Sequence, residues 1–302
     1  MKVLIAGATG VVGRPLVRML TEGGHEVFAL TRSRRPVFGA TAVVADAMDR
    51  TSLLAAVDGL RIDAVVHQLT ALKKAPTREG LMAATNVLRT EGTANLLAAA
   101  RATGARRFVS QSFYGGYGFR DHGDEPLTED APFGSGEPFP ATVAAMGSAE
   151  EQIFTADGIE GISLRYGGFY GPGAVDGMLD GLRKRRFPVA RGGPAPWCYI
   201  DDAASATVAA LGNGRGGQAY NICDDEPATW ADVLIELARA FDAPKPMTLP
   251  GPLVRLMAPY AGALMTRTSM RLSTVKAKEE LGWKPSVTGY RDGLARTREV
   301  IG

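Results

Sequence analysis

The chain has 302 residues, of which 45% are hydrophobic and 22% are charged, an ordinary composition for a soluble globular protein. Its formal net charge of +2 is too small to indicate a nucleic acid or an anionic membrane as partner, and no apolar run approaches the ~20 residues of a membrane span. A strand begins directly after Lys2 with no signal-peptide-like run, and Cys198 and Cys223 form no C-x-x-C pair, so we expect a cytoplasmic protein.

A glycine-rich turn joins the first predicted strand to the first predicted helix. The apolar run at residues 3–6 predicts a buried strand, and Val12, Leu16 and Leu20 then recur at helical spacing. Glycine lets the backbone approach a pyrophosphate closely, while a helix N-terminus offers free N–H groups and the positive end of its dipole. The turn, spaced G-x-x-G-x-x-G, therefore predicts a dinucleotide site. Its residues are Gly7, Thr9, Gly10, Val11, Val12 and Gly13.

This spacing and the motifs that follow it resemble the short-chain dehydrogenase/reductase superfamily, in its extended branch of NAD(P)-dependent epimerases and dehydratases. The matching segments include G-T-x-N-L-L at residues 92–97, R-F-V at 107–109, L-R-x-x-x-x-Y-G-P-G at 164–173 and L-G-W-x-P at 281–285. They occur in the order of the family and cover nearly the whole chain. Residues 78–103 are predicted to form one long helix, which Gly104 ends. The resemblance implies an α/β fold, with a Rossmann-type doubly wound parallel sheet and a smaller C-terminal α/β substrate lobe.

The resemblance also implies a division of the chain. We expect residues 1–170 to form the NAD(P)-binding Rossmann domain and residues 197–217 to return to it. Residues 171–196 and 218–302 are expected to build the lobe, with a small-molecule substrate held between the two parts at the carboxyl ends of the strands. No nucleic acid and no membrane are expected as partners, no metal ligands are assigned, and the chain is expected to be a monomer or a homodimer.

The predicted second strand, residues 26–30, ends in a basic segment. Many NAD enzymes place an acid about 20 residues past the glycines, on the ribose 2′-hydroxyl. Here guanidinium groups stand instead, and these bind a 2′-phosphate through charge-assisted hydrogen bonds. The segment therefore favours NADP, with NAD possible, and the alternative is a solvated basic loop. The residues assigned to this contact are Thr31, Arg32, Ser33 and Arg35, beside Arg34.

Further cofactor residues are assigned through the resemblance. Residues 46–49 resemble the D-x-x-D segment of the family, which contacts adenine, and Asp46 is expected to make this contact. The alternative function of such an aspartate is to cap a helix N-terminus, and this suits Asp49. After the predicted strand at residues 63–67, a turn passes under the middle of the cofactor, and Gln68 is expected to face the nicotinamide. We expect His67 to have a satisfied ring rather than a catalytic role. The full set is Asp46, Ala47, Gln68, Leu69, Thr70, Asn86, Gln111, Tyr166 and Gly167.

The catalytic segments depart from the family at two places. After the predicted strand at residues 107–112 the family carries Ser or Thr, but Phe113 aligns best, with Ser112 beside it. The predicted helix at residues 141–155 should carry Tyr-x-x-x-Lys, in which the Tyr is the general acid/base and the Lys lowers its pKa. Thr142 and Met146 stand at those positions. A threonine hydroxyl titrates too high to replace a phenol, and methionine carries no charge.

The candidate catalytic residues are therefore Tyr114, Ser112 and Tyr117, with Tyr166 and Gln111 as further candidates. Three classes of function stay open. One is an NAD(P)-dependent oxidoreductase or epimerase/dehydratase-like enzyme acting on a small carbonyl, alcohol or sugar-type substrate. The others are a redox-neutral cyclase, dehydratase or isomerase, and a non-catalytic NADP sensor. We place the oxidoreductase first, since an intact substrate lobe argues against a sensor. The sequence gives no substrate.

Overall fold

A seven-stranded parallel sheet forms the centre of the structure, a computed structural model that describes residues 1–72, 75–134 and 137–301. The strand order is β10-β6-β5-β4-β1-β2-β3, and every pairing is parallel. The order reverses between β1 and β4, which is where open α/β sheets bind ligands at the carboxyl ends of their strands. The strands are β1 (Lys2–Ala6), β2 (Glu26–Thr31), β3 (Thr41–Val44), β4 (Ala64–His67), β5 (Arg107–Phe113), β6 (Glu160–Tyr166) and β10 (Gln218–Ile222). The predicted doubly wound α/β fold is confirmed.

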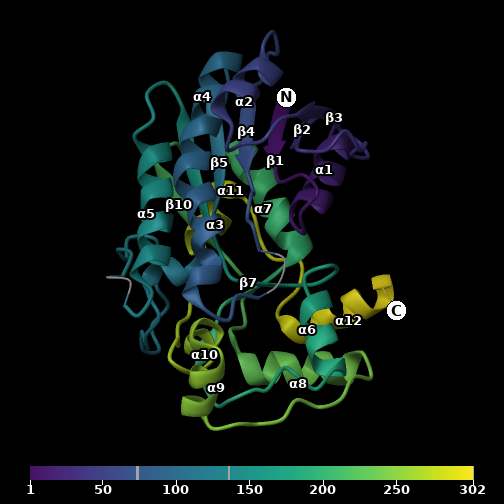
Figure 1. Ribbon diagram of the computed structural model, residues 1–302, viewed down its shortest axis with the longest axis vertical. Coiled ribbons are helices and arrows are strands. Elements are labelled where there is room, and N and C mark those ends of the chain that lie inside the picture. The colour runs from purple at the N-terminus through teal and green to yellow at the C-terminus, as the bar shows by residue number, and fades with distance from the viewer. Residues whose placement is uncertain (73–74, 135–136, 302) are drawn as a thin grey trace.

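Helices cover both faces of this sheet (Figure 1). Because successive strand residues point to opposite faces, Val3 and Ile5 pack under one helical layer and Leu4 and Ala6 under the other. The first layer consists of α1 (Gly13–Glu22), α7 (Ile200–Asn213) and α11 (Val275–Leu281). The second consists of α2 (Arg50–Val57), α4 (Thr93–Thr103) and α5 (Pro140–Phe154).

The long helix expected at residues 78–103 is interrupted by a turn of different geometry. It consists of a 3₁₀ turn η1 (Glu79–Met82), α3 (Ala83–Val87), a π-helical turn η2 (Leu88–Gly92) and then α4. Gly104 ends it in the left-handed conformation with φ 79°, as predicted. A π-helical turn rotates the side chains within it relative to a continuous α-helix, and such turns are frequent at functional sites.

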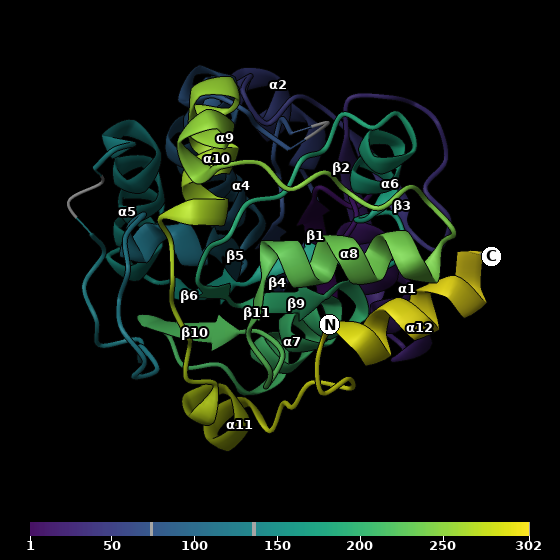
Figure 2. The ribbon, with the colours of Figure 1, turned by 90° about the horizontal axis from the view of Figure 1, so that it is seen from below.

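A smaller body packs against the carboxyl ends of the strands (Figure 2). Its core is formed by side chains of α6 (Asp176–Arg183), α8 (Trp230–Ala240) and α12 (Tyr290–Ile301). Two short strand pairs complete it: β7 (Gly168–Tyr170) with β9 (Trp197–Tyr199), and β8 (Pro194–Ala195) with β11 (Ala228–Thr229). The remaining helices are α9 (Gly251–Met257) and α10 (Pro259–Thr266), and a 3₁₀ turn η3 (Tyr114–Tyr117) follows β5.

The expected boundary at residue 218 is wrong for two segments. β10 pairs with β6 in the main sheet, in the register Gln218 to Ile162, and α11 packs on α7 and β10. The physical reason is that β6 would otherwise form an edge strand with unpaired backbone N–H and C=O groups. The buried residues 219–222 of β10 form hydrogen bonds with these groups. The pair β7 and β9 also differs from the expected division, because its side chains pack in the core of the smaller body. The rest of the division into residues 1–170 with 197–217, and 171–196 with 218–302, stays a prediction.

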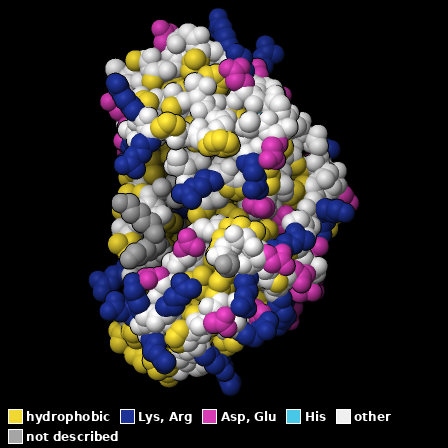
Figure 3. Space-filling model, turned by 90° about the vertical axis from the view of Figure 1, so that its right-hand side faces the viewer, with side chains coloured by type: hydrophobic (Ala, Val, Ile, Leu, Met, Phe, Trp, Pro, Cys, Tyr) yellow, Lys and Arg dark blue, Asp and Glu magenta, His cyan; other side chains and the backbone are white. Residues whose placement is uncertain are grey.

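The face drawn in Figure 3 carries both signs of charge, with Lys and Arg interspersed with Asp and Glu over both bodies. No helix in the described part of the chain is long and apolar enough to cross a membrane.

Asp224 links the end of β10 to the smaller body. Its Oδ2 accepts a hydrogen bond from the Tyr170 hydroxyl at 2.6 Å, and its Oδ1 accepts one from the Tyr199 N–H at 3.1 Å. The residue is 3% exposed, and burial raises the pKa of its carboxyl to about 7. The folded protein therefore binds a proton at this carboxyl more tightly than the unfolded chain does.

Stability should consequently fall as the pH rises through the window between the ordinary aspartate pKa near 4 and the folded value of about 7. Asp224→Asn removes the charge and keeps one acceptor, for the Tyr199 N–H, while its amide NH2 can donate to the Tyr170 oxygen. The variant should therefore lack this loss of stability, which amounts to at most ~1.4 kcal/mol per pH unit. Urea unfolding of both proteins from pH 4 to pH 8 measures it. A constant difference in unfolding free energy across that range would contradict the raised pKa.

Candidate active site

The glycine turn is shaped by close backbone approach. Gly7 has φ +102°, and a Cβ there would lie 2.8 Å from the backbone carbonyl of Gln68. A Cβ at Gly13 would lie 2.1 Å from the Gly7 carbonyl oxygen, so these two positions admit no side chain. Gly10 differs, because its Cβ would meet, among the described residues, the Gly7 oxygen alone, at 3.2 Å. A side chain at Gly10 would therefore require a shift of a few tenths of an ångström, much less than at Gly13.

The turn also offers unused hydrogen-bond donors. Within residues 1–72, 75–134 and 137–301, nothing accepts a hydrogen bond from the N–H groups of Val11 and Val12. They stand at the start of α1, beside the point where the strand order reverses. Free N–H groups at a helix N-terminus bind anions, so the residues present fit the pyrophosphate of a dinucleotide.

The basic segment after β2 is exposed and ordered by its own turn. Thr31 Oγ1 accepts a hydrogen bond from the Ser33 N–H at 3.1 Å, and Ser33 Oγ accepts one from the Arg35 N–H at 3.2 Å. Among the described residues no carboxylate forms an ion pair with Arg32, Arg34 or Arg35. The guanidinium groups are thus available to an external anion, and their contact with a 2′-phosphate stays a prediction.

The segment after β3 contains two aspartates, Asp46 and Asp49, which form different contacts. Asp49 Oδ1 accepts a hydrogen bond from the Ser52 N–H at 3.0 Å, which confirms it as the N-cap of α2. Asp46 Oδ1 accepts one from the Met48 N–H at 3.0 Å, and the Ala47 carbonyl accepts one from Asn95 at 2.9 Å. The adenine contact of Asp46 and Ala47 stays a prediction.

Gln68 and Tyr166 meet beneath the ends of β4 and β6. Gln68 Nε2 donates to the Tyr166 hydroxyl at 3.3 Å, and that hydroxyl lies 2.7 Å from Thr207 Oγ1. Burial raises the pKa of Tyr166, and the amide oxygen of Gln68 is buried without a partner among the described residues. Tyr166 is thus fixed by contacts to the helix below it, while Gln68 keeps one acceptor free.

The backbone around these residues is also ordered. The His67 ring lies 3.3 Å from the Leu88 carbonyl and accepts the Leu69 N–H at 3.3 Å, so its ring is satisfied as expected. Burial lowers its pKa to about 4. The Gly167 N–H donates to the Ile222 carbonyl at 2.9 Å. Of the remaining assigned residues, Thr70 follows β4, Gln111 lies near the end of β5 and Asn86 lies in α3, and their cofactor contacts stay predictions.

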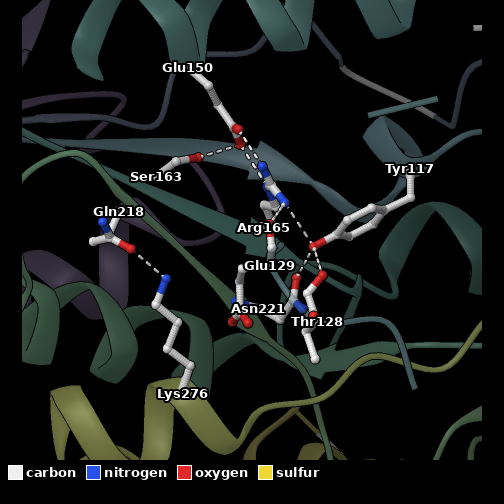
Figure 4. Close-up of polar contacts among 9 residues, drawn as sticks. All are labelled: Tyr117, Thr128, Glu129, Glu150, Ser163, Arg165, Gln218, Asn221 and Lys276. Atoms are coloured by element: carbon white, nitrogen blue, oxygen red, sulfur yellow. Dashed lines mark hydrogen bonds and ion pairs between the residues drawn. The ribbon is translucent and has the colours of Figure 1, made fainter. Parts of the chain in front are cut away.

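The three tyrosine hydroxyls proposed as proton donors are buried, but only two of them are bonded. The Tyr117 hydroxyl accepts from Arg165 Nη1 at 2.9 Å and donates to Asn221 Oδ1 at 2.7 Å (Figure 4). The Tyr114 hydroxyl and Ser112 Oγ have no partner in the described part of the chain. Burial raises the pKa of both Tyr114 and Tyr117. Whether any of these groups moves a proton stays a prediction.

The Tyr117 contacts belong to a buried ionic network that the sequence did not reveal. Arg165 Nη2 lies 2.7 Å from Glu150 Oε2, and Ser163 Oγ donates to Glu150 Oε1 at 2.7 Å (Figure 4). Both charged side chains are 8% exposed. These residues lie far apart in the sequence, so only the folded chain shows that the ion pair holds the Tyr117 hydroxyl.

Helix α5 carries Thr142 and Met146, and their alignment with the family's tyrosine and lysine stays a prediction. Thr142 and Met146 are both buried, and the Thr142 hydroxyl has no partner among the described residues. The Thr142 N–H donates to Glu79 Oε1 at 3.1 Å, which ties α5 to η1. Met146 packs in an apolar cluster instead of presenting a charge.

That cluster lies where α5, η3 and α10 meet, and it includes an aromatic group formed by Tyr114, Phe119, Phe139 and Tyr260. The ring centroid of Tyr260 lies 5.3 Å from that of Phe119 and 4.8 Å from that of Phe139. A cavity of about 300 Å³ opens beside it, lined by residues that include Tyr117, Phe119 and Phe133. These side chains come from segments far apart in the chain, so no single sequence motif predicts that they pack together.

No group of three or more His, Cys, Asp or Glu side chains in the described ranges is arranged to hold a metal ion.

The sequence is similar to those of several known proteins. The NAD dependent epimerase/dehydratase family matches residues 3–223. A 3-diazoavenalumate denitrifying reductase of Streptomyces sp is 41% identical, over 98% of this chain and 100% of its own. A 2-alkyl-3-oxoalkanoate reductase of Stenotrophomonas maltophilia is 32% identical, over 81% of this chain and 77% of its own.

The fold has relatives among solved structures as well. A UDP-glucose 4-epimerase of Thermotoga maritima with UDP-glucose superposes with a TM-score of 0.79 at 23% identity, covering 100% of this chain and 98% of its own. At that identity the likeness concerns the fold alone. The family match spans well over half of the chain and includes the glycine turn, the basic segment and the ends of all the central strands. The chain is therefore an enzyme that belongs to the NAD dependent epimerase/dehydratase family.

Proposed function

We propose that the protein is an NADPH-dependent reductase whose substrate is reduced without a proton from a protein side chain. The observation that carries this proposal is the pair Thr142 and Met146 on α5, where the family's tyrosine and lysine would stand. Reduction of a ketone leaves an alkoxide that must be protonated, and a positioned acid is worth roughly 10²–10⁴ in rate. A site without such an acid suits an electrophile that needs none.

A diazo-bearing aromatic substrate meets that requirement. When hydride adds to the carbon of an arenediazonium ion, a C–H bond forms, the C–N bond breaks, and its electron pair leaves with N₂. No proton enters the balance, and NADPH, which supplies the hydride when bound, is oxidised to NADP⁺. The printed name of the 41% identical relative describes a denitrifying reductase of a diazo compound. The aromatic group formed by Tyr114, Phe119, Phe139 and Tyr260 offers surfaces on which an aromatic ring would pack.

The protein's own residues then have three tasks in this reaction. The glycine turn holds the pyrophosphate, and Gln68 and Tyr166 border the place expected for the nicotinamide. The buried cluster around Met146 excludes water, which matters because water would compete for a diazonium carbon. No residue is assigned a proton-transfer role.

The reaction is tested with an arenediazonium carboxylate and NADPH deuterated at nicotinamide C4. We expect release of N₂ and deuterium on the ring carbon that carried the diazo group. Thr142→Val and Met146→Leu should keep turnover within about threefold, because neither residue takes part in proton transfer. Protein carrying Gly10→Val serves as the background control for direct reaction with NADPH.

The outcomes separate the classes. A collapse of turnover in Thr142→Val with intact cofactor binding would place its hydroxyl in a proton path and contradict the proposal. Loss of ketone reduction in Tyr114→Phe, Tyr117→Phe or Tyr166→Phe would identify an acid and make the enzyme a ketone reductase. Activity on a substrate with no net change in NADPH would favour the redox-neutral class.

NADP(H) should bind more tightly than NAD(H), because the exposed guanidinium groups after β2 lack carboxylate partners among the described residues. Arg32→Ala should cost about 1.5–3 kcal/mol in NADP affinity, as for a hydrogen bond to a charged group, and leave NAD affinity nearly unchanged. Calorimetric titration measures both cofactors, with the exposed Arg101→Ala on α4 as matched control. Equal affinities of the wild-type protein for the two cofactors would rule out the NADP assignment.

Gly10→Val should abolish dinucleotide binding while the protein stays folded. In the described part of the chain a Cβ at Gly10 meets the Gly7 oxygen alone, at 3.2 Å, but it would stand on the turn whose backbone a pyrophosphate must approach closely. Titration should show no cofactor heat, and thermal unfolding should stay close to that of wild type. Gly212→Val is the matched control, since no atom of the described residues lies within 4 Å of a Cβ at that position. Cofactor binding retained in Gly10→Val would place the phosphate site elsewhere.

A further inference from the structure

We propose that Arg89 is the anchor for a carboxylate group of the substrate, and that the enzyme therefore takes aromatic carboxylates. The assignment of the reacting group rests on the proposed function. The anion site rests on independent observations, which concern the burial of Arg89, its missing counter-charge and its place beside the aromatic group.

Arg89 is a buried cation without an acidic partner. The residue is 8% exposed, and its guanidinium donates one hydrogen bond, from Nη1 to the side-chain oxygen of Asn86 at 3.2 Å. Across residues 1–72, 75–134 and 137–301 no carboxylate forms an ion pair with it. Glu79, at the start of the same helical segment, instead accepts the Thr142 N–H.

Arg165 shows how this chain satisfies a guanidinium that the fold itself requires. It is 7% exposed, yet Glu150 accepts hydrogen bonds from its Nε at 3.0 Å and its Nη2 at 2.7 Å. Its Nη1 also donates to Tyr117 at 2.9 Å. Arg89 has none of these acceptors although it is as deeply buried. A desolvated charge that is left unpaired is costly to the fold, so the arrangement is completed only when an anion binds.

The position of Arg89 points to the substrate rather than to the protein surface. It lies in the π-helical turn η2, which packs against α5, the helix that carries Met146 in place of the family's lysine. Tyr260 of α10 is close enough for the guanidinium to lower its pKa against the effect of burial. Tyr260 also belongs to the aromatic group. The cation thus stands at one side of the surface on which an aromatic ring would pack.

Two further polar groups at the aromatic group have no partner beyond each other. The Tyr114 hydroxyl and the Trp230 indole N–H are both buried, and the indole N–H is near enough to lower the pKa of the phenol as a hydrogen-bond donor, but neither group has another partner among the described residues. An apolar wall with a few unused polar groups and one unpaired charge is the usual make-up of a small-molecule site. The planar fork of a guanidinium matches the two oxygens of a carboxylate, which makes a carboxylate the anion of choice.

Binding to the full-length protein, saturated with NADP⁺, tests the site without any turnover. The probes are benzoate, cinnamate and 4-hydroxycinnamate, each compared with its methyl ester by calorimetry. Wild type should bind at least one acid about tenfold or more tightly than its ester, as expected for a charge-assisted bidentate contact. Arg89→Met should abolish this preference, leave ester binding unchanged and keep NADP⁺ affinity within about twofold, and Arg89→Lys should restore part of it.

Thermal unfolding supplies a second readout that a structural arginine would not give. Arg89→Met should unfold at the same or a higher temperature than wild type in the absence of ligand, because it removes an unpaired buried charge. Arg165→Met is the matched control and should unfold at a lower temperature, because it leaves Glu150 buried and unpaired.

Three results would overturn the assignment. The first is a wild-type protein that does not prefer any of the acids over its ester. The second is an Arg89→Met variant that keeps the preference or loses stability as Arg165→Met does. The third is a large loss of NADP⁺ affinity in Arg89→Met, which would assign the guanidinium to the cofactor. Acid binding that depends on Arg89 without reduction of a diazo compound would support the anion site and reject the proposed reaction alone.

Discussion

The buried ion pair between Arg165 and Glu150 is the interaction on which the catalytic side of the sheet depends. It joins the strand β6 to the helix α5, and through the Tyr117 hydroxyl and Asn221 it reaches η3 and β10. Removing one partner of such a pair leaves the other charge buried and unpaired, which lowers the free energy of unfolding by ~3–5 kcal/mol. The pair therefore fixes where α5 lies over the sheet, and with it the position of every side chain that α5 presents to the site.

The same network constrains the chemistry. Tyr117 follows β5 closely and looked available as an acid, but its hydroxyl is held between a cation and an amide. Tyr166 is held in a similar way by Gln68 and Thr207. Burial also makes the ionised form of each phenol unfavourable. The hydroxyls of Tyr117 and Tyr166 thus hold neighbouring side chains in place. A reaction that transfers hydride without a proton does not require either hydroxyl as an acid, so it is compatible with this arrangement.

Two buried arginines serve opposite purposes in this structure. Arg165 is neutralised inside the protein and stabilises the arrangement of strands and helices. Arg89 is equally buried but leaves most of its donors unused, in a π-helical turn that departs from regular helix geometry. An unpaired charge beside apolar and aromatic side chains is neutralised only when a ligand of opposite charge binds. The same charge that increases the affinity for this ligand therefore lowers the stability of the ligand-free protein.

The sequence by itself determined the features that depend on neighbouring residues. The glycine turn between a strand and a helix, the Asp49 cap, the Gly104 helix end and the absence of tyrosine and lysine on α5 are all local, because backbone conformation and residue identity over a few positions decide them. Only the tertiary structure decided that β10 joins the main sheet, since pairing with β6 depends on an edge formed by residues far away in the chain. The place of Arg89 was decided in the same way. Whether a guanidinium is solvated or buried, paired or unpaired, depends on every element packed around it, here η2, α5 and α10, and no short motif contains that information.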